Sequence, residues 1–377
     1  MTDETRRPDA GRSALTETSG GASEPLLARR DRALAHVTLQ RQDALNALTR
    51  AMKHAFATAL TAWEADPEIY AIVLDSSVPR AFCTGADLAE FREPGSRFDE
   101  ILATQAEESR LLWRIECCVK PMVSLIDGLV MGSGAGLSMF GTHRVAGEGY
   151  SFAMPETGIG YFPDAGATLF LSRLPDHAGV YLGLTGARVG RADAHALGLV
   201  THCISRRHFD AVRTALADAD PIDPLLDGRH EPLPPGELAA LRSAIARCFG
   251  CDTVEKIIVA LSAETGETKS WAERTLAVLA QRAPASLKIA HRQLRAPPHR
   301  DLKDALELEY RMAVHCLARP DFQEGIRTVL VDKRAAPRWK PATLAEVTPE
   351  MVDAVFAPVG ARELVLPPRP QSLVALG

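Results

Sequence analysis

Two carboxylates and two glycine-containing turns are the residues of this chain whose types and spacing can do chemistry. Glu156 and Asp164 lie in residues 152–166, a segment too rich in glycine and proline for a plain strand or helix. Upstream, residues 132–134 read Gly-Ser-Gly. Glycine lets a ligand approach the main chain closely, and exposed backbone N–H groups stabilise a developing oxyanion. Oxyanion donors beside a carboxylate base are the minimum parts for acyl or enolate chemistry.

Each glycine turn must be positioned by a strand before it and a helix after it. Residues 122–126 form an apolar run of strand length, and the small residues 135–140 favour a helix, so the chain turns across residues 132–134. The same order recurs around Gly85-Ala86, which follows the apolar residues 81–83. Two such turns can supply two N–H donors to one oxygen atom.

The first part of the chain has the pattern of a mixed α/β fold. Residues 34–39 predict a strand, and a helix with Thr49 as its N-cap is expected to run to about Ala65. The continuous apolar run at 69–75 is typical of a strand buried on both faces of a parallel sheet. Further helices are predicted at residues 107–115, 169–174, 178–184 and 189–197.

A proline-rich segment separates this part from a helical one. Residues 220–235 contain five prolines among acidic residues. We therefore predict a disordered tail at 1–25, a core with the active site at 26–220, and a mainly helical region at 221–377. In the last of these, helical periodicity predicts helices at 236–249, 254–264, 268–283, 285–294 and 302–317.

Composition excludes several classes of partner. The chain has 377 residues, 46% of them hydrophobic, and a formal net charge of −5, so we expect no nucleic-acid partner and no membrane surface as partner. No apolar run reaches the roughly 18 residues of a membrane span. Seven scattered cysteines, an odd number, favour a reducing compartment, and we expect the cytoplasm.

Three segments carry a specific resemblance. Residues 81–88, 120–137 and 152–166 resemble the crotonase (enoyl-CoA hydratase/isomerase) superfamily. Within it they are most similar to the branch that hydrolyses 3-hydroxyisobutyryl-CoA, a likeness that residues 324–333 and 337–341 share. The resemblance covers about residues 26–360. It implies an α/β fold, a crotonase-like spiral of ββα units with a helical C-terminal region, and a homo-oligomer.

The resemblance also implies roles for individual residues. The carbonyl of an acyl-CoA thioester would accept hydrogen bonds from the backbone N–H groups of Ala86 and Ser133, the second of which is usually glycine in the family. Glu156 matches the catalytic glutamate, and Asp164 matches the carboxylate that contacts the acyl hydroxyl. The remaining substrate-binding residues would be Glu108, Gly132, Gly134 and, at the CoA phosphates, Lys333. No metal is implied, and no cofactor other than the CoA of the substrate.

Position 136 decides between the reactions of this superfamily. Its hydratases usually carry a second glutamate there, whereas this chain has Gly136. With one glutamate, Glu156, we expect hydrolysis of a short β-hydroxyacyl-CoA, specifically 3-hydroxyisobutyryl-CoA in valine catabolism. Glu156 would either attack the thioester or activate water. The alternatives are a hydratase or isomerase on the same fold and a non-catalytic acyl-CoA-binding protein. A dinucleotide site is disfavoured because the third glycine of its fingerprint would fall on Leu137.

Overall fold

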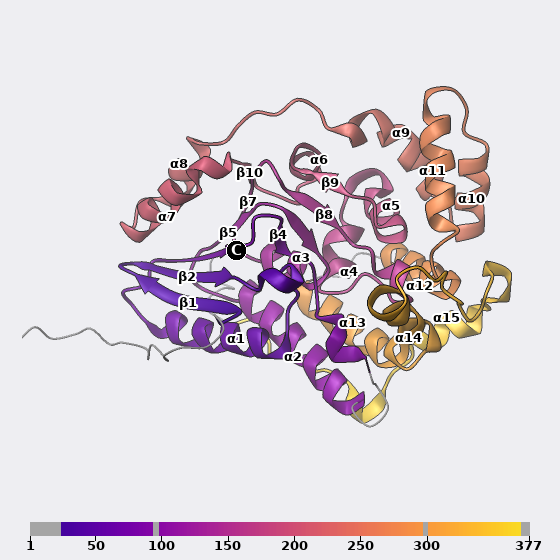
Figure 1. Cartoon of the computed structure of the whole chain (residues 1–377), viewed down its shortest axis with the longest axis horizontal. Helices are drawn as coiled ribbons and strands as arrows, with labels where there is room; N and C mark the ends of the chain where they lie inside the picture. Colours follow the sequence, from indigo (N-terminus) through magenta and orange to yellow (C-terminus); the bar gives the residue numbers. More distant parts are fainter. Residues whose placement is uncertain (1–23, 93–97, 297–300, 371–377) are drawn as a thin grey trace, which may run out of the picture.

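Two β-sheets with helices packed around them make up the described part of the chain (Figure 1). The structure is a computed structural model, and it describes residues 24–92, 98–296 and 301–370. Almost all of the predicted tail at 1–25 lies outside the described residues. Within the described ranges, no helix combines the length and the apolar character that crossing a membrane would require.

The larger sheet has six strands in the order β1-β2-β3-β5-β7-β10. Only β1 runs antiparallel to its neighbour, and the other strands pair in parallel. The predicted strands at 34–39, 69–75 and 122–126 are confirmed within two residues as β2, β3 and β5. The bounds are β1 (Leu26–Asp31), β2 (Leu34–Leu39), β3 (Ala71–Ser76), β5 (Met122–Ile126), β7 (His143–Ala146) and β10 (His202–Cys203).

The smaller sheet has four short strands in the order β4-β6-β8-β9. They are β4 (Ala81–Cys83), β6 (Leu129–Met131), β8 (Ser151–Ala153) and β9 (Val189–Gly190). The chain alternates between the sheets, as β3 then β4, β5 then β6, and β7 then β8, with a helical segment after each pair. This alternation confirms the spiral of ββα units. It also corrects one detail, because the strand entering the turn at 132–134 is the short β6 and not residues 122–126.

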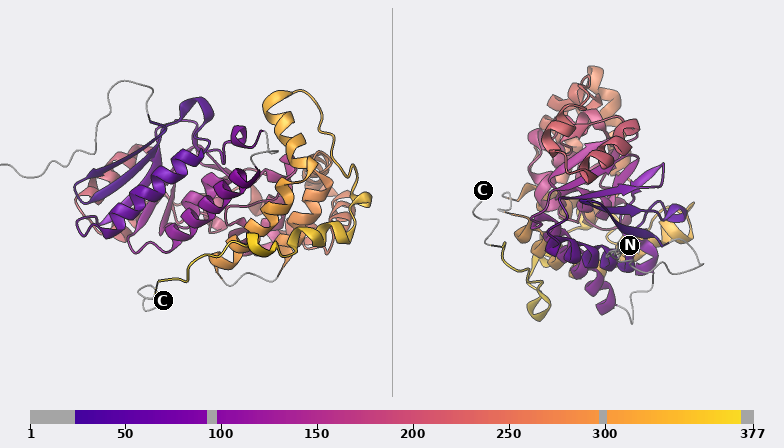
Figure 2. Two further views of the ribbon diagram at one scale, coloured as in Figure 1. Left: turned by 90° about the horizontal axis from the view of Figure 1, so that it is seen from below. Right: turned by 90° about the vertical axis from the view of Figure 1, so that its left-hand side faces the viewer.

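Helices cover both faces of the larger sheet (Figures 1 and 2). Alternate residues of β3 point to opposite faces, so Ile72 and Leu74 join one hydrophobic core while Ala71 and Val73 join another. The first core includes α1 (Arg50–Ala65) and α2 (Phe98–Glu116), and the second includes α7 (Phe209–Ala217) and α8 (Ile222–Asp227). Thr49 caps α1 as expected, since its hydroxyl accepts a hydrogen bond from the N–H of Met52.

The C-terminal half of the described chain is helical, as predicted. The five predicted helices correspond to α9 to α13, with matching bounds for α13. The prediction at 189–197 was wrong in part, because Val189 pairs with Phe152 in β9 and only Arg191–Ala196 are helical. One hydrophobic core runs from Leu26 to Leu366, and the subdivision near residue 220 stays a prediction. The helices not yet bounded are α3 (Ser133–Met139), α4 (Ala167–Ser172), α5 (Ala178–Thr185), α6 (Arg191–Ala196), α9 (Glu237–Phe249), α10 (Val254–Ser262), α11 (Lys269–Leu279), α12 (Pro284–Arg295), α13 (Leu302–Leu317), α14 (Pro320–Ile326) and α15 (Pro349–Phe356).

Candidate active site

Three neighbouring parallel strands of the smaller sheet deliver the predicted chemical groups to one place. Parallel strands end at the same edge of a sheet, and β4, β6 and β8 are adjacent and parallel. Ala86 follows β4, Ser133 follows β6 and Glu156 follows β8, each within three residues of the strand end. All three line one cavity of about 360 Å³. The topology therefore explains why groups distant in sequence share a site.

The two glycine turns touch each other and face Glu156. A methyl group placed on Gly132 would lie 3.0 Å from Glu156 Oε1 and 3.6 Å from the Cα of Gly85. Gly132 has φ +47° and Gly85 has φ +101°, conformations that side chains disfavour. Only glycine fits at either position, because a side chain would be strained and, at Gly132, would press on the carboxylate. The residues that follow these glycines, Ala86 and Ser133, line the same cavity as Glu156.

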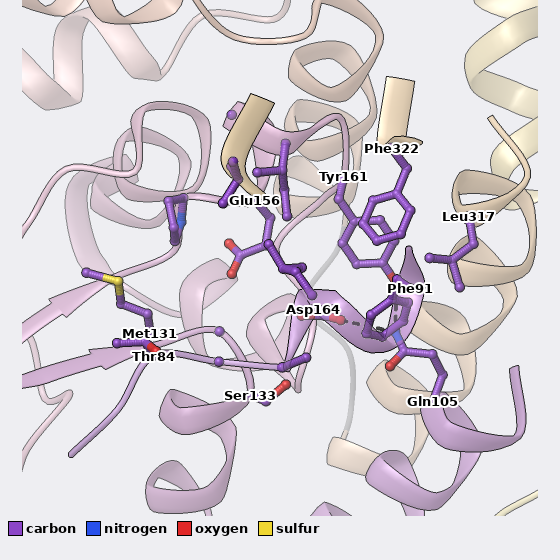
Figure 3. A pocket seen from close by; sticks show the side chains of 18 of the residues that line it. Thr84, Phe91, Gln105, Met131, Ser133, Glu156, Tyr161, Asp164, Leu317 and Phe322 are labelled. Carbon is purple, nitrogen blue, oxygen red and sulfur yellow. Dashed lines mark hydrogen bonds between the residues drawn. The ribbon is translucent and has the colours of Figure 1, made fainter. Parts of the chain in front are cut away.

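The cavity has one polar wall and one apolar end (Figure 3). Glu156, Asp164 and Ser133 line it with polar groups. Phe91 and Tyr161 both pack against Phe322 at one end of the cavity, with ring centroids 5.7 and 5.2 Å from that of Phe322. A slot of this kind suits an acyl chain whose carbonyl points at the glycine turns. The other apolar lining side chains are Leu88, Met131, Ile159, Leu317 and Val329.

Glu156 is buried in an environment that disfavours its charge. The residue is 7% exposed, and its Oε2 has no hydrogen-bond partner among the described residues. Burial raises the pKa of Glu156 to about 8, against a weaker opposing effect of the Arg282 guanidinium in the cavity wall. A carboxylate with few hydrogen bonds and a raised pKa is both a better base and a better nucleophile than a solvated one.

Asp164 lies among other acids that favour its protonated form. Gln105 Nε2 lies 3.0 Å from the hydroxyl of Tyr161 and 3.5 Å from Asp164 Oδ2. Burial first, and then the negative charges of Glu108 and Glu156, raise the pKa of Asp164 well above its usual value. A protonated Asp164 can donate a hydrogen bond or a proton into the cavity, which an ionised one cannot.

Glu108 lies behind the cavity wall. It lines a small adjoining cavity that shares Gln105, Tyr161 and Asp164 with the main one. It forms a buried ion pair with Lys53, and both residues are at most 5% exposed. Its substrate contact, predicted from the resemblance, therefore stays a prediction; in the structure Glu108 acts on Asp164 through its charge.

Two other predicted substrate-binding residues do not line the cavity. A methyl group on Gly134 would lie 2.5 Å from the carbonyl oxygen of Cys83, so this glycine lets α3 pack closely on β4. Lys333 is exposed in a turn shortly after Val329, which does line the cavity. A contact between Lys333 and CoA phosphates stays a prediction.

Gly136 is sealed off from the cavity. It lies inside α3, where a methyl group would come within 2.7 Å of the carbonyl oxygen of Ala165 and 3.1 Å of Leu112 Cδ1. A glutamate in this position would have to displace the backbone next to Asp164. The structure therefore has room for one glutamate at the glycine turns and not for two.

We expect Gly136→Ala to destabilise the protein by about 1–3 kcal/mol, because the added methyl overpacks a site bounded by backbone. The measurement is the free energy of unfolding in urea. Gly190→Ala is the matched control, since Gly190 has φ −80° and nothing lies within 4 Å of the place that its added methyl would take. Equal stability of the two variants would contradict the close contact at residue 136.

Two polar residues that line the cavity, Arg282 and Gln105, were not predicted from the sequence. Arg282 lies between α11 and α12, lines the cavity, and contacts the carbonyl oxygen of Thr185 through its guanidinium. Gln105 is on α2, one helical turn before Ser109. A buried polar residue within an apolar helical stripe is a signal that could have identified Gln105, whereas nothing local marks Arg282.

The described residues contain no group of three or more histidine, cysteine, aspartate or glutamate side chains arranged to hold a metal ion. The C-x-x-C pair, Cys248 and Cys251, belongs to α9 and the turn after it. Cys248 Sγ lies 3.5 Å from Glu264 Oε1 and Cys251 Sγ lies 3.8 Å from the carbonyl of Arg247. All seven cysteines are free thiols.

A family model described as enoyl-CoA hydratase/isomerase matches residues 34–356. Among curated proteins, 3-hydroxyisobutyryl-CoA hydrolase, mitochondrial, of Rattus norvegicus is 37% identical over 93% of this chain and 91% of its own. The protein named 3-hydroxyisobutyryl-CoA hydrolase 1 of Arabidopsis thaliana is 38% identical over 90% of this chain and 93% of its own.

Two solved structures are about as similar to this chain in sequence as the curated proteins are, but they are named for other reactions. A carnitinyl-CoA dehydratase from Mycobacterium thermoresistibile has a TM-score of 0.85 and 37% identity, covering 91% of this chain and 99% of that one. An enoyl-CoA hydratase from Rhodobacter sphaeroides has a TM-score of 0.85 and 36% identity, covering 91% and 100%. These names agree on CoA thioesters and differ on the reaction, so the residues of the site must decide it.

Proposed function

The chain belongs to the enoyl-CoA hydratase/isomerase family, and from that premise we propose that it hydrolyses the thioester bond of a short 3-hydroxyacyl-CoA. The best candidate substrate is 3-hydroxyisobutyryl-CoA, giving 3-hydroxyisobutyrate and CoA in valine catabolism. The names of the curated relatives support this choice.

Gly136 is the observation that favours hydrolysis over hydration as the reaction of this protein. Adding water across a double bond in this family uses two carboxylates, one on each side of the water. Here the second position holds a glycine with Ala165 and Leu112 packed against it. Attack on a thioester carbonyl needs an oxyanion site and one base or nucleophile, and those groups surround the cavity.

The proposed reaction begins with the thioester carbonyl between the two glycine turns. The N–H groups of Ala86 and Ser133 donate hydrogen bonds to its oxygen and stabilise the negative charge that forms there. In one route Glu156 takes a proton from water as the water oxygen bonds to the carbonyl carbon. In the other, Glu156 itself bonds to that carbon, and water later cleaves the anhydride. Both routes use the same geometry.

Collapse of the tetrahedral intermediate breaks the carbon–sulfur bond. The departing thiolate of CoA takes up a proton, and we assign its delivery to the protonated Asp164. Before that step Asp164 donates a hydrogen bond to the 3-hydroxyl group of the substrate. The environment of Asp164, buried among Glu108, Glu156 and Glu309, supports this assignment, because a protonated carboxyl can donate where a carboxylate cannot.

The proposal extends to the state of the protein in the cell. No cofactor beyond the CoA of the substrate is needed for hydrolysis. We propose a homo-oligomer, as family resemblance implies, in a reducing compartment such as the cytoplasm, which the seven free thiols favour.

The pH dependence of the free enzyme should follow Glu156. Its reactive form is the carboxylate, and its pKa is raised to about 8, so kcat/KM should rise with pH up to about 8 and decline again only where Asp164 loses its proton. Below that pH the buried carboxyl of Glu156 is protonated and neutral, so it neither attacks the thioester nor accepts a proton from water. The measurement is kcat/KM for CoA release across buffers of constant ionic strength. A plateau that begins several pH units below 8 would contradict the assignment.

Product analysis tests the proposed function directly. Purified protein is offered a panel of short 3-hydroxyacyl-CoA and enoyl-CoA thioesters. Hydrolysis releases a free thiol that a thiol reagent detects, whereas hydration consumes the enoyl chromophore without thiol. We expect thiol release, fastest with 3-hydroxyisobutyryl-CoA. Loss of the chromophore alone would favour a hydratase, and binding without turnover of any thioester would favour an acyl-CoA-binding protein.

A further inference from the structure

The segment that carries Asp164 is an irregular turn clamped from the helical region. After Asp164, Ala165 has φ +57° and Gly166 has φ +85°, two left-handed residues in succession. A non-glycine residue in this conformation costs of order 1 kcal/mol and persists only when its surroundings hold it. The turn leads into α4, and Asp164 at its start lines the main cavity.

Glu309 binds this turn through two backbone N–H groups. It lies on α13, is 4% exposed, and accepts hydrogen bonds from Gly166 at 2.7 Å and Thr168 at 2.8 Å. One carboxylate oxygen serves each donor. Burial raises the pKa of Glu309 to about 7, although these N–H groups oppose the shift. The proposed reaction gives this acid no role, and it faces the small cavity that also contains Asp164 and Glu108.

Gln293 is a second side chain that holds the same turn, and it carries no charge. Its Nε2 donates to the carbonyl oxygen of Pro163 at 2.7 Å and to the hydroxyl of Thr168 at 2.7 Å. The residue lies on α12 and is fully buried. Gln293 therefore holds the turn on both sides of Asp164 without a charge, whereas Glu309 holds it only after Asp164 and is acidic, which permits their roles to be separated.

The charged groups facing Asp164 come from every element packed around it. Glu108 on α2, Glu156 after β8 and Glu309 on α13 are acidic, and Lys53 on α1 is basic. Tyr161 adds a buried hydroxyl that shares Gln105 with Asp164. Lys53 is already paired with Glu108. Because like charges close together cannot all ionise, each acid in this group favours the protonated form of Asp164.

We propose that Glu309 is a positioning residue for Asp164: through Gly166 and Thr168 it fixes the turn, and through its negative charge it keeps Asp164 in the proton-donating form. This inference rests on the proposed function, in which Asp164 donates to the substrate hydroxyl and to the leaving thiolate. Glu309 itself does not line the main cavity and is not assigned any contact with substrate.

The test compares Glu309→Gln with Gln293→Leu in the full-length protein. Glu309→Gln removes the charge and keeps the size, while Gln293→Leu loosens the same turn without changing any charge. We expect kcat to fall in both, by on the order of 10- to 100-fold, because small misplacements of a reacting group are costly. Only Glu309→Gln should move the alkaline limb of the pH profile to lower pH, since Asp164 then loses its proton more readily.

An infrared titration provides a readout that does not depend on turnover. The carbonyl stretch of protonated Asp164 is isolated by subtracting the spectrum of Asp164→Asn. We expect this band to disappear at lower pH in Glu309→Gln than in the wild type, and at an unchanged pH in Gln293→Leu. Equal titration of all three proteins, or parallel pH profiles for both variants, would reduce Glu309 to a structural residue and overturn the inference.

Failure of the proposed function would give a different experimental result from failure of the inference about Glu309. A wild-type protein that releases no thiol from any 3-hydroxyacyl-CoA would refute hydrolysis, while the infrared comparison would still decide whether Glu309 controls the proton on Asp164. Circular dichroism and urea unfolding of both variants establish that they are folded. If Glu309→Gln does not fold, Glu309→Asp, which keeps the charge on a shorter side chain, replaces it and should retain the wild-type titration of Asp164.

Discussion

Glu156→Gln should lower the rate of CoA release by about 10⁴-fold, because the amide can neither attack the thioester nor accept a proton from water. Glutamine has nearly the same shape, and the wild-type carboxyl is largely protonated at neutral pH because its pKa is about 8. Binding of an acyl-CoA should therefore stay close to that of the wild type. Thiol release gives the rate, and titration calorimetry with CoA, which neither protein consumes, compares the dissociation constants.

Glu267→Gln is the matched control for this substitution. Glu267 is exposed in a short helical turn before α11, far along the sequence from the cavity-lining residues of β4, β6 and β8. The same chemical change there should leave both rate and binding unaltered. A Glu156→Gln protein that keeps a rate within a few-fold of the wild type would eliminate Glu156 as base and as nucleophile, and with it the proposed mechanism.

Ser133→Pro should lower the rate of CoA release, because proline has no backbone N–H to donate to the oxyanion. Ser133 is the first residue of α3, a position where proline is well tolerated because its nitrogen has no helical partner. The fold should therefore survive. Loss of one oxyanion donor should lower kcat by about 10²- to 10³-fold, equivalent to roughly 3 kcal/mol in the barrier. Thiol release measures the rate, and circular dichroism verifies the fold.

Ser133→Gly separates the N–H of this residue from its side chain. It keeps the donor and removes the buried hydroxyl, so activity should be equal to or above that of the wild type. Should Ser133→Pro and Ser133→Gly both retain wild-type rates, the N–H of residue 133 would have no part in stabilising the oxyanion. A loss of activity in the glycine variant alone would assign a role to the hydroxyl instead.

Local signals account for the parts of the fold that the sequence predicts well. Thr49 marks the start of α1, and the periodic apolar residues Met52, Phe56 and Leu60 mark its buried face. For α13, Asp301 caps the first turn and apolar residues recur through to Leu317. Cap and periodicity act within one or two turns of the chain, so they can be recognised without knowing what packs against the helix.

The short strands and the contacts between residues distant in sequence could not be predicted, for physical reasons. The strands β6 and β9 have three and two residues, too few for alternation to show, and they exist because neighbouring strands pair with them. Glu156 and the glycine turns were recognised because their motifs are contiguous. Arg282 and Glu309 were not, since their contacts with the site span about a hundred residues or more. For Glu108, the ion pair with Lys53 depends on the packing of α1 on α2.

The clamps on Asp164 join residues that are 143 and 130 positions apart, Gly166 with Glu309 and Pro163 with Gln293. During synthesis the ribosome therefore releases the glycine turns and both acids well before the helices that hold them in place. A nascent chain ending before α12 would carry every residue that reacts and lack the groups that fix the turn. Contacts of such sequence separation form slowly, so we expect thioester cleavage to appear late in refolding, after most of the sheet has formed.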